Sequence, residues 1–514
     1  MIRVRRGVPA IGLILMILTV FYFSSTPLVS AEPRGVMKIT SHWQMRLDWN
    51  DPSDVRENLS FFNLYLFHDS LLKPTPEGWY SPSLAESWKI SPDYRVYEFN
   101  LRKGVKFHNG DEMTAEDVVF TFQRYRGGLA EFLKGRIEKL EAVNPYLFRV
   151  TFKKPLVDFL NYFLPGDCAI GWVVPKKYIQ KVGEEEYRKH PVGCGPYKFV
   201  EFKPGIALVG EAFKDYWRKE PKIKRLEFLF VGEPSTRYAM VKKGEIDIAT
   251  LMTDVFYKRV KEDPSLRVGE PPSPTSFTVY MGAQWDPKSP WSDPRVRKAA
   301  SLALDRKLIA DIHNPGASPM GNFGLQGDPD NIGFTPDPYD PEGAKKLLAE
   351  AGYPKGFHGG KYFPFDGPYW PMGEQVANYW KAIGITVDTT LYDRPTWFSK
   401  RKAGEFKGGV WTDPIAPIPI GLKLAYVFGA GAYGKYDDIQ ALWDKYLGSV
   451  DPKERKDLIT RVQNMYHDRT MFVHLIGASS PAAVGPRVKG DPWKIKPIIW
   501  WVCPMEDLEL NSYD

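Results

Sequence analysis

The feature that most constrains this chain is a long uncharged apolar stretch at its N-terminus. Three arginines within the first six residues precede about 16 residues, from Val8 to Phe23, that carry no charge. This order is typical of an export signal, and Val29-Ser30-Ala31 predicts cleavage after Ala31. The run is shorter than the roughly 20 residues that span a bilayer. An uncleaved membrane anchor remains the alternative, and no later stretch indicates a second span.

Residues 1–31 are therefore expected to be a signal peptide, and roughly 480 residues remain for the mature protein. A chain of that length is too long for one core, so two or more domains are expected. The sequence carries a formal charge of +7, and removal of the three leader arginines lowers it to +4. The excess is mild and lacks blocks of lysine and arginine, which argues against nucleic acid as a partner.

Strand and helix patterns alternate along the chain, which predicts an α/β fold with mixed sheets flanked by helices. Residues 97–101 alternate apolar and polar side chains as a strand does, and Val105 and Phe107 continue the alternation in a second strand after the break at Gly104. Thr114 then stands where a helix N-cap would. Further strands are expected at residues 225–231 and 385–391. Three more helices are predicted by an Asp-Pro pair, because Asp caps free amides and Pro fits the first helical position: they follow Asp293-Pro294, Asp340-Pro341 and Asp451-Pro452.

Two Pro- and Gly-rich stretches divide the chain further. Residues 269–274 are expected to cross between domains, and residues 484–486 are the expected return crossing, so that the two together form a two-strand hinge. The three cysteines leave two alternatives open. Cys168 and Cys194 would close the shortest loop, leaving Cys503 as an odd thiol, or all three are reduced and buried.

Several short motifs follow one another along the chain: 82–88 (PSLAESW), 97–110 (YEFNLRKGVKFHNG), 114–118 (TAEDV), 193–197 (GCGPY), 215–217 (DYW), 244–248 (GEIDI), 296–300 (VRKAA) and 344–348 (AKKLL). In this order they resemble the peptide-type extracellular solute-binding proteins, family 5, which include the oligopeptide, dipeptide and nickel binding proteins of ABC importers. The motifs cover nearly the whole mature chain. Most suit turns, strands and capped helices, so they identify the fold and not the ligand.

The resemblance implies a two-lobed periplasmic-binding-protein fold that closes on its solute, with a third, inserted domain. It places lobe I at residues 32–72, 177–270 and 488–514, the inserted domain at 73–176 and lobe II at 271–487. The implied partners are a small-molecule or peptide solute and the membrane permease subunits of an ABC importer. A monomer is expected. Solute held by one lobe would add contacts to the other, so binding favours the closed state.

Candidate solute contacts follow from the same resemblance. In peptide-binding relatives an acidic residue in a Trp-and-Asp segment meets the peptide amino group, and Asp413 is the nearest match, beside Trp411. A turn or cap role for Asp413 and core packing for Trp411 are the alternatives. Tyr280 and Gln284 fall where relatives present a strand end to the cleft, although an amide of asparagine is usual there. A surface loop is the other interpretation of Gln284.

Three further contacts are expected at the cleft. Trp43 and Arg56 fall where relatives present residues of the first lobe to the cleft. The guanidinium of Arg56 could bind a carboxylate through two parallel hydrogen bonds. Tyr433 lies in a glycine-rich loop, residues 429–434, that formally matches a dinucleotide fingerprint. Because prolines precede it and no strand leads into it, we expect a flexible loop at the cleft mouth instead.

No catalytic motif, metal-ligand spacing or cofactor motif stands out, and the eight histidines are scattered. We therefore expect a binding protein with no catalytic residue, no metal site and no cofactor. The alternatives are a secreted carbohydrate-active enzyme, whose carboxylate pair can be far apart in sequence, and a surface protein with no small-molecule ligand. No cysteine for lipid attachment lies near Ala31, so a free protein in a periplasm is expected.

Overall fold

The computed structural model describes residues 32–54, 60–75, 78–164, 170–270, 274–323, 327–416, 418–425, 427, 436–478, 480–492 and 504–513. The leader lies outside these residues, so the export signal and its cleavage site stay predictions. Within the described part, no helix combines the length and the apolar character that crossing a membrane requires.

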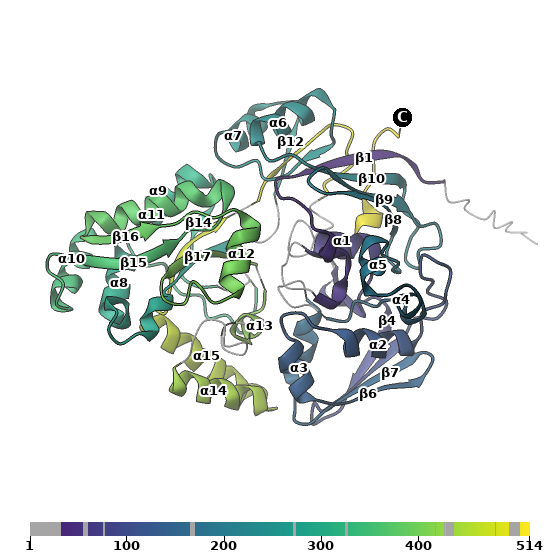
Figure 1. Ribbon diagram of the computed structural model, residues 1–514, viewed down its shortest axis with the longest axis horizontal. Helices are drawn as coiled ribbons and strands as arrows, with labels where there is room; N and C mark the ends of the chain where they lie inside the picture. The colour runs from purple at the N-terminus through teal and green to yellow at the C-terminus, as the bar shows by residue number, and fades with distance from the viewer. Residues whose placement is uncertain are drawn as a thin grey trace, which may run out of the picture. The chain divides into compact units, whose positions relative to one another are not determined.

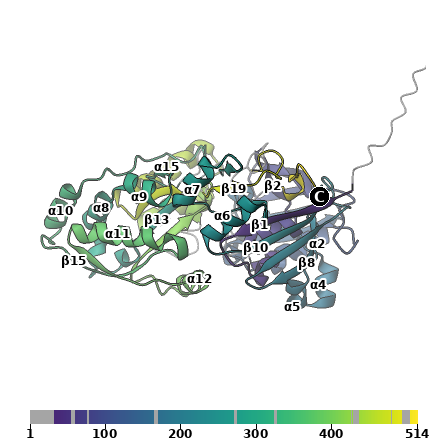
Figure 2. The ribbon, with the colours of Figure 1, turned by 90° about the horizontal axis from the view of Figure 1, so that it is seen from above.

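A seven-stranded sheet is built from segments far apart in the sequence. Its strand order is β12-β19-β11-β1-β10-β9-β8. The central β1 pairs in parallel with β10 and β11, and its second half is mostly buried, as expected for a strand covered on both faces. Figure 2 shows α6 beside β1 and β10. The strands are β1 (Arg34–Ser41), β8 (Tyr197–Lys203), β9 (Ala207–Ala212), β10 (Ile223–Phe230), β11 (Ile248–Ala249), β12 (Arg267–Gly269) and β19 (Ala482–Val484).

Helices of this part connect and cover the strands. Residues of α6 contact β11, those of α7 contact β12, and those of α1 contact β8. Val241, Val260 and Ala483 belong to a small apolar core beneath α6 and α7. The helices are α1 (Phe61–Phe67), α4 (Lys176–Val182), α5 (Glu184–Lys189), α6 (Pro234–Lys243) and α7 (Asp254–Glu262).

An inserted domain lies in sequence between α1 and α4. It contains a four-stranded antiparallel sheet of order β4-β5-β7-β6, against which α2 packs, and a small two-stranded sheet, β2-β3. β5 and β7 alternate buried and half-buried residues, as the sequence pattern predicts. The elements are β2 (Leu72–Thr75), β3 (Gly78–Pro82), β4 (Ala85–Ile90), β5 (Val96–Leu101), α2 (Ala115–Arg124), α3 (Ala130–Arg136), β6 (Ile137–Asn144), β7 (Leu147–Phe152) and the 3-10 helix η4 (Val157–Phe163).

A six-stranded mixed sheet of order β14-β18-β13-β17-β15-β16 forms the other lobe. Figure 1 shows α8, α10 and α11 gathered around β15 and β16. The strands are β13 (Thr275–Tyr280), β14 (Ser318–Pro319), β15 (Phe357–Phe363), β16 (Ile385–Thr389), β17 (Val410–Ile415) and β18 (Phe472–Ala478). The helices are α8 (Pro294–Leu302), α9 (Arg306–His313), α10 (Pro341–Glu350), α11 (Trp370–Ala382), α12 (Arg394–Lys402), α13 (Ile420–Leu424), α14 (Asp437–Gly448) and α15 (Pro452–Asp468).

The chain passes between the two large sheets twice. β12 belongs to the seven-stranded sheet and β13 to the six-stranded one, so the Pro-rich stretch at 269–274 is a crossing, as predicted. The return crossing differs from the prediction. β19 pairs with β11 and β12, so the chain has already returned to the seven-stranded sheet by Ala482. The Gly-Pro pair at 485–486 instead follows β19, where the Gly485 amide donates to the Asp247 carbonyl.

The predicted helix caps are present. Asp293, Asp340 and Asp451 each accept a hydrogen bond from a backbone amide in the first turn of α8, α10 and α15. Thr114 and Asp117 form a capping box at the start of α2. Strands at 225–231 and 385–391 correspond to β10 and β16, but only β5 forms within residues 97–107, where Lys106 makes an isolated bridge.

The family motifs hold the scaffold together. The hydroxyl of Tyr216 and the indole nitrogen of Trp217 both donate to Asp69, each at 2.7 Å. A Cβ on Gly193 would lie 2.0 Å from the carbonyl oxygen of Phe67, so only glycine lets this corner approach the end of α1. Cys194, in the same corner, is a buried free thiol. Cys168 and Cys503 lie outside the described residues.

Candidate functional site

Two of the aromatic residues predicted to contact solute lie on neighbouring strands of the six-stranded sheet. Tyr280 ends β13 and pairs across the ladder with Trp411 of β17. Their rings stack with centroids 5.2 Å apart and planes 8° from parallel. A Cβ on Gly282 would lie 2.5 Å from the Trp411 ring, so this glycine makes room for the indole. Each aromatic residue is only 4% exposed, so the pair is buried in this form of the protein.

Asp413 lies two residues beyond Trp411 on the same face of β17. Its carboxylate is paired with the guanidinium of Arg401, 2.6 Å away, on α12. A buried carboxylate needs such a partner, because an isolated charge is costly away from water. The sequence predicts a solute ammonium as this partner, but in the structure Arg401 of the chain itself provides the cation.

A second arginine of α12 makes a similar contact. Arg394 donates two hydrogen bonds to Asp366, at 2.9 and 3.1 Å, just after the end of β15. Arg394 and Arg401 are seven residues apart, so they lie on one face of the helix and anchor it at both ends. Sequence reasoning missed both arginines. Their spacing on one helix could be predicted from the sequence. Their partners could not, because Asp366 and Asp413 lie 28 and 12 residues away in the chain.

Gln284 lies in the 3-10 helix η5 (Gly282–Trp285) and is buried. Its side-chain amide donates to the carbonyl oxygens of Met281, at 2.9 Å, and Met471, at 3.2 Å. Its side-chain oxygen accepts from the hydroxyl of Tyr436 at 3.3 Å. Gln284 therefore ties the end of β13 to the residue before β18 and is not part of a surface loop.

Trp43 follows the end of β1 in the seven-stranded sheet and is also buried. The ring of His42 meets it edge-on, with centroids 4.4 Å apart. Burial, then the positive charges of Arg237 and Arg394, hold the pKa of His42 well below its usual range. The imidazole is therefore neutral at pH 7.

Arg56 and Tyr433 lie outside the described residues, so their expected contacts stay predictions. The structure brings together Tyr280, Trp411 and Asp413 on one sheet face, and Gln284 lies in the 3-10 helix that follows β13. Trp43 follows the end of β1 in the other large sheet, and the charge of Arg394 acts on its neighbour His42.

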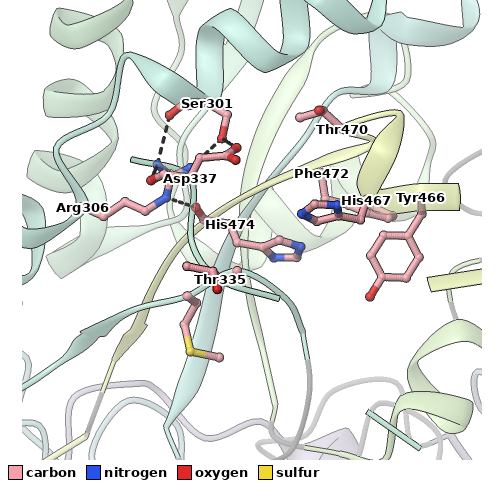
Figure 3. A pocket seen from close by; sticks show the side chains of 11 residues that line it. Ser301, Arg306, Thr335, Asp337, Tyr466, His467, Thr470, Phe472 and His474 are labelled. Carbon is pink, nitrogen blue, oxygen red and sulfur yellow. Dashed lines mark hydrogen bonds between the residues drawn. The ribbon is translucent and has the colours of Figure 1, made fainter. Parts of the chain in front are cut away.

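The six-stranded lobe also contains a small polar cavity, whose lining does not include Tyr280, Trp411 or Asp413. Its volume is about 20 Å³, which suits one water molecule rather than a solute. Figure 3 shows Arg306 reaching the carbonyl of His474, and Ser301 reaching Asp337. Burial lowers the pKa of His474 to about 3, with help from the charge of Arg306. These contacts are structural.

An open groove of about 520 Å³ lies on the lobe that contains the seven-stranded sheet, and part of its lining comes from residues 45–48, shortly after Trp43 in the sequence. Met45, Leu47 and Phe202 supply its apolar lining, and Arg46 and Arg188 are among the charged residues at its rim. Across the described ranges, no cluster of three or more His, Cys, Asp or Glu side chains could hold a metal ion.

Comparison with known proteins places the chain in a family. Residues 80–414 match the family described as "Bacterial extracellular solute-binding proteins, family 5 Middle", which is more than half of the sequence. The chain belongs to this family. It is therefore an extracytoplasmic solute-binding protein of an ABC importer, as its motifs predict, and the relatives reported below are binding proteins rather than enzymes.

Two relatives show the extent of the match. The heme-binding protein A of Haemophilus influenzae is 29% identical over 452 residues, which cover 80% of this chain and 81% of the relative. The dipeptide-binding protein of Escherichia coli is 27% identical over 453 residues, covering 80% and 83%.

Solved structures share the fold. The binding protein AgaA of A. tumefaciens, in complex with agropinic acid, superposes with a TM-score of 0.79 at 22% identity, covering 93% of this chain and 98% of its own. The ABC transporter-associated periplasmic binding protein DppA of Helicobacter pylori, in complex with the peptide STSA, gives 0.78 at 24% identity, covering 93% and 99%. The architecture is the two-lobed periplasmic-binding-protein fold with an inserted third domain.

Proposed function

We propose that this protein captures a short peptide or a related compound between its two lobes and passes it unchanged to an ABC permease. One observation carries the choice of solute class: the stacked Tyr280 and Trp411 lie on the same sheet face as the Asp413–Arg401 pair. An aromatic wall next to paired opposite charges suits a solute with an apolar side chain and charged backbone ends, as a short peptide has.

The relatives support this choice. One relative is named a dipeptide-binding protein, two others di/tripeptide-binding proteins, and several a glutathione-binding protein. Heme is the competing solute, because the match to heme-binding protein A covers as much of this chain as the match to the dipeptide-binding protein does. The proposed solute contacts are Trp43, Arg56, Tyr280, Gln284, Trp411, Asp413 and Tyr433, with Arg401 added as the cation beside Asp413.

Mass spectrometry of the solute that co-purifies with the native protein tests the proposal. A closed cleft retains its ligand, so a peptide or a peptide-like compound is expected in the denatured extract. A panel of dipeptides and tripeptides should then raise the unfolding temperature, by mass action. Recovery of heme would show that the solute is heme and not a peptide. Hydrolysis of an added oligosaccharide would favour the carbohydrate-active enzyme. No shift across a broad solute panel would favour a surface protein.

The protein is further proposed to act in a periplasm as a free monomer, after cleavage following Ala31. The charged and then apolar order of the first residues supports export, and no cysteine near Ala31 offers a site for a lipid. N-terminal sequencing of the exported protein should begin at Glu32. A sequence beginning near Met1 would instead indicate a retained membrane anchor.

A further inference from the structure

Asp158 joins the inserted domain to the six-stranded lobe. It lies in η4, and its Oδ1 accepts a hydrogen bond from Arg455 Nη2 of α15 at 2.7 Å. The hydroxyl of Tyr446, on α14, donates to the same oxygen at 3.3 Å. These partners are 297 and 288 residues away in sequence. The contact therefore joins two parts of the chain that are built on different sheets.

Both charged side chains are shielded from water. The side chain of Arg455 is 9% exposed and that of Asp158 is 12% exposed. Ion pairs at such positions are screened much less than surface pairs, and removing one partner leaves the other charge in a costly environment. The pair therefore has more effect on the contact than an exposed pair would.

Each partner is also held in place by its own part of the chain. The guanidinium of Arg455 lies 3.9 Å from the centre of the Tyr446 ring, and its Nη1 donates to the carbonyl oxygens of Tyr446 and Ser449. On the other side, the Asn161 amide donates to Asp158 at 3.4 Å. Because both side chains are already oriented, little conformational entropy is lost when they meet.

The surroundings of the pair are acidic. Burial, followed by the charges of Asp158, Asp328 and Asp330, raises the pKa of Tyr80 on β3. Asp328 and Asp330 belong to the six-stranded lobe, whereas Asp158 and Tyr80 belong to the inserted domain. Without the cation of Arg455, carboxylates of the two parts would face each other. Like charges repel, and the cations of Arg455, paired with Asp158, and Lys456, paired with Asp330, offset this repulsion.

We propose that Asp158 and Arg455 form a latch by which the inserted domain holds the protein in its closed form. The two residues position the lobes for solute capture, although neither belongs to the proposed solute contacts. This gives the inserted domain a role in closure, and the role does not depend on which solute binds.

Single-molecule energy transfer between dyes on the two parts tests the latch without any solute. Labels at K139C on β6 and A441C on α14 report the separation, since both positions are exposed. Cys168 and Cys503 are replaced by serine, and the buried Cys194 is retained. We expect a population at short distance in the wild type. D158A should reduce that population at least threefold, and Y446F should reduce it by a smaller factor.

The control is R461Q, which removes an exposed charge from α15, the helix that also carries Arg455. Arg461 pairs with Asp457 within α15, on the exposed surface, so the short-distance population should not change. Thermal unfolding of each variant checks that both parts remain folded. A short-distance population in D158A equal to that of the wild type would overturn the latch, as would a wild type with no such population. Neither result would bear on the identity of the solute.

Discussion

Asp413 is the residue on which the proposed solute contact depends most. The sequence placed it in a Trp-and-Asp segment, and in the structure it is buried near Trp411 on one face of β17. The segment could not reveal Arg401, because the partner of a buried carboxylate is chosen by the packing of α12 on the sheet. The ion pair changes the expected chemistry of the site, since a solute would meet a carboxylate and a guanidinium together.

Asp413→Asn should affect both stability and binding. The substitution leaves the Arg401 charge without its carboxylate, so the free energy of unfolding should fall by about 3 kcal/mol. Affinity for the solute identified by mass spectrometry should fall by about 2 kcal/mol or more, or roughly 30-fold. Urea unfolding and isothermal titration measure the two effects.

Asp337→Asn is the control for this change. Asp337 is a half-buried acid of the same lobe that pairs with Lys298 beside the small cavity. Its loss should lower stability and leave affinity unchanged. Unaltered affinity in Asp413→Asn would remove Asp413 from the solute site and leave it a structural role.

His68 should make the protein sensitive to mild acid. It is fully buried, and burial lowers its pKa to about 4 in the folded protein, against 6.5 in the unfolded chain. Between these values only the unfolded chain takes up the proton, so stability falls as the pH drops from 6.5 towards 4. The contribution lost between pH 7.5 and 5 is about 2 kcal/mol.

Urea unfolding of His68→Gln at the two pH values checks this sign. Glutamine can still donate to the Asn50 carbonyl, which lies 3.0 Å from His68 Nε2. The variant should lose about 2 kcal/mol of the pH dependence that the wild type shows. His358→Gln, at an exposed position, should retain it all. An identical pH dependence in His68→Gln and the wild type would contradict the prediction.

At the scale of elements, helix starts were predictable because their signals are local. An aspartate before a proline caps its own helix, and the caps at Asp293, Asp340 and Asp451 depend on no distant residue. The return crossing was not predictable in the same way. β19 is three residues long and is defined by pairing with β11 and β12, which lie more than 200 residues earlier in the chain.

Asp340→Ala should cost about 1 kcal/mol of stability, because the Gly343 amide loses its acceptor at 2.8 Å. The matched control is Asp437→Ala at the start of α14, where the residue is exposed and the N-cap makes no side-chain hydrogen bond. That change should lower stability by no more than about 0.5 kcal/mol. Equal losses in the two variants, measured by urea unfolding, would show that the cap at Asp340 contributes nothing beyond its charge.

At the scale of the whole molecule, the family motifs predicted two lobes, a hinge and an inserted domain, because each motif fixes a local corner or strand of a known scaffold. They could not predict how the inserted domain contacts the six-stranded lobe. The Asp158–Arg455 pair joins residues 297 apart, and neither residue lies in a motif. A contact between side chains of different domains leaves no periodic pattern in the sequence.

Solute binding should therefore stabilise the inserted domain through the latch. Binding favours the closed form, and closure brings Arg455 against Asp158, so opening of η4 should become rarer. Hydrogen exchange of a peptide covering residues 157–164 should slow at least threefold when the identified solute is added to the wild type. In D158A the solute should still slow exchange in β17 but leave η4 unchanged. Equal slowing of η4 in both proteins would mean that closure reaches the inserted domain by another route.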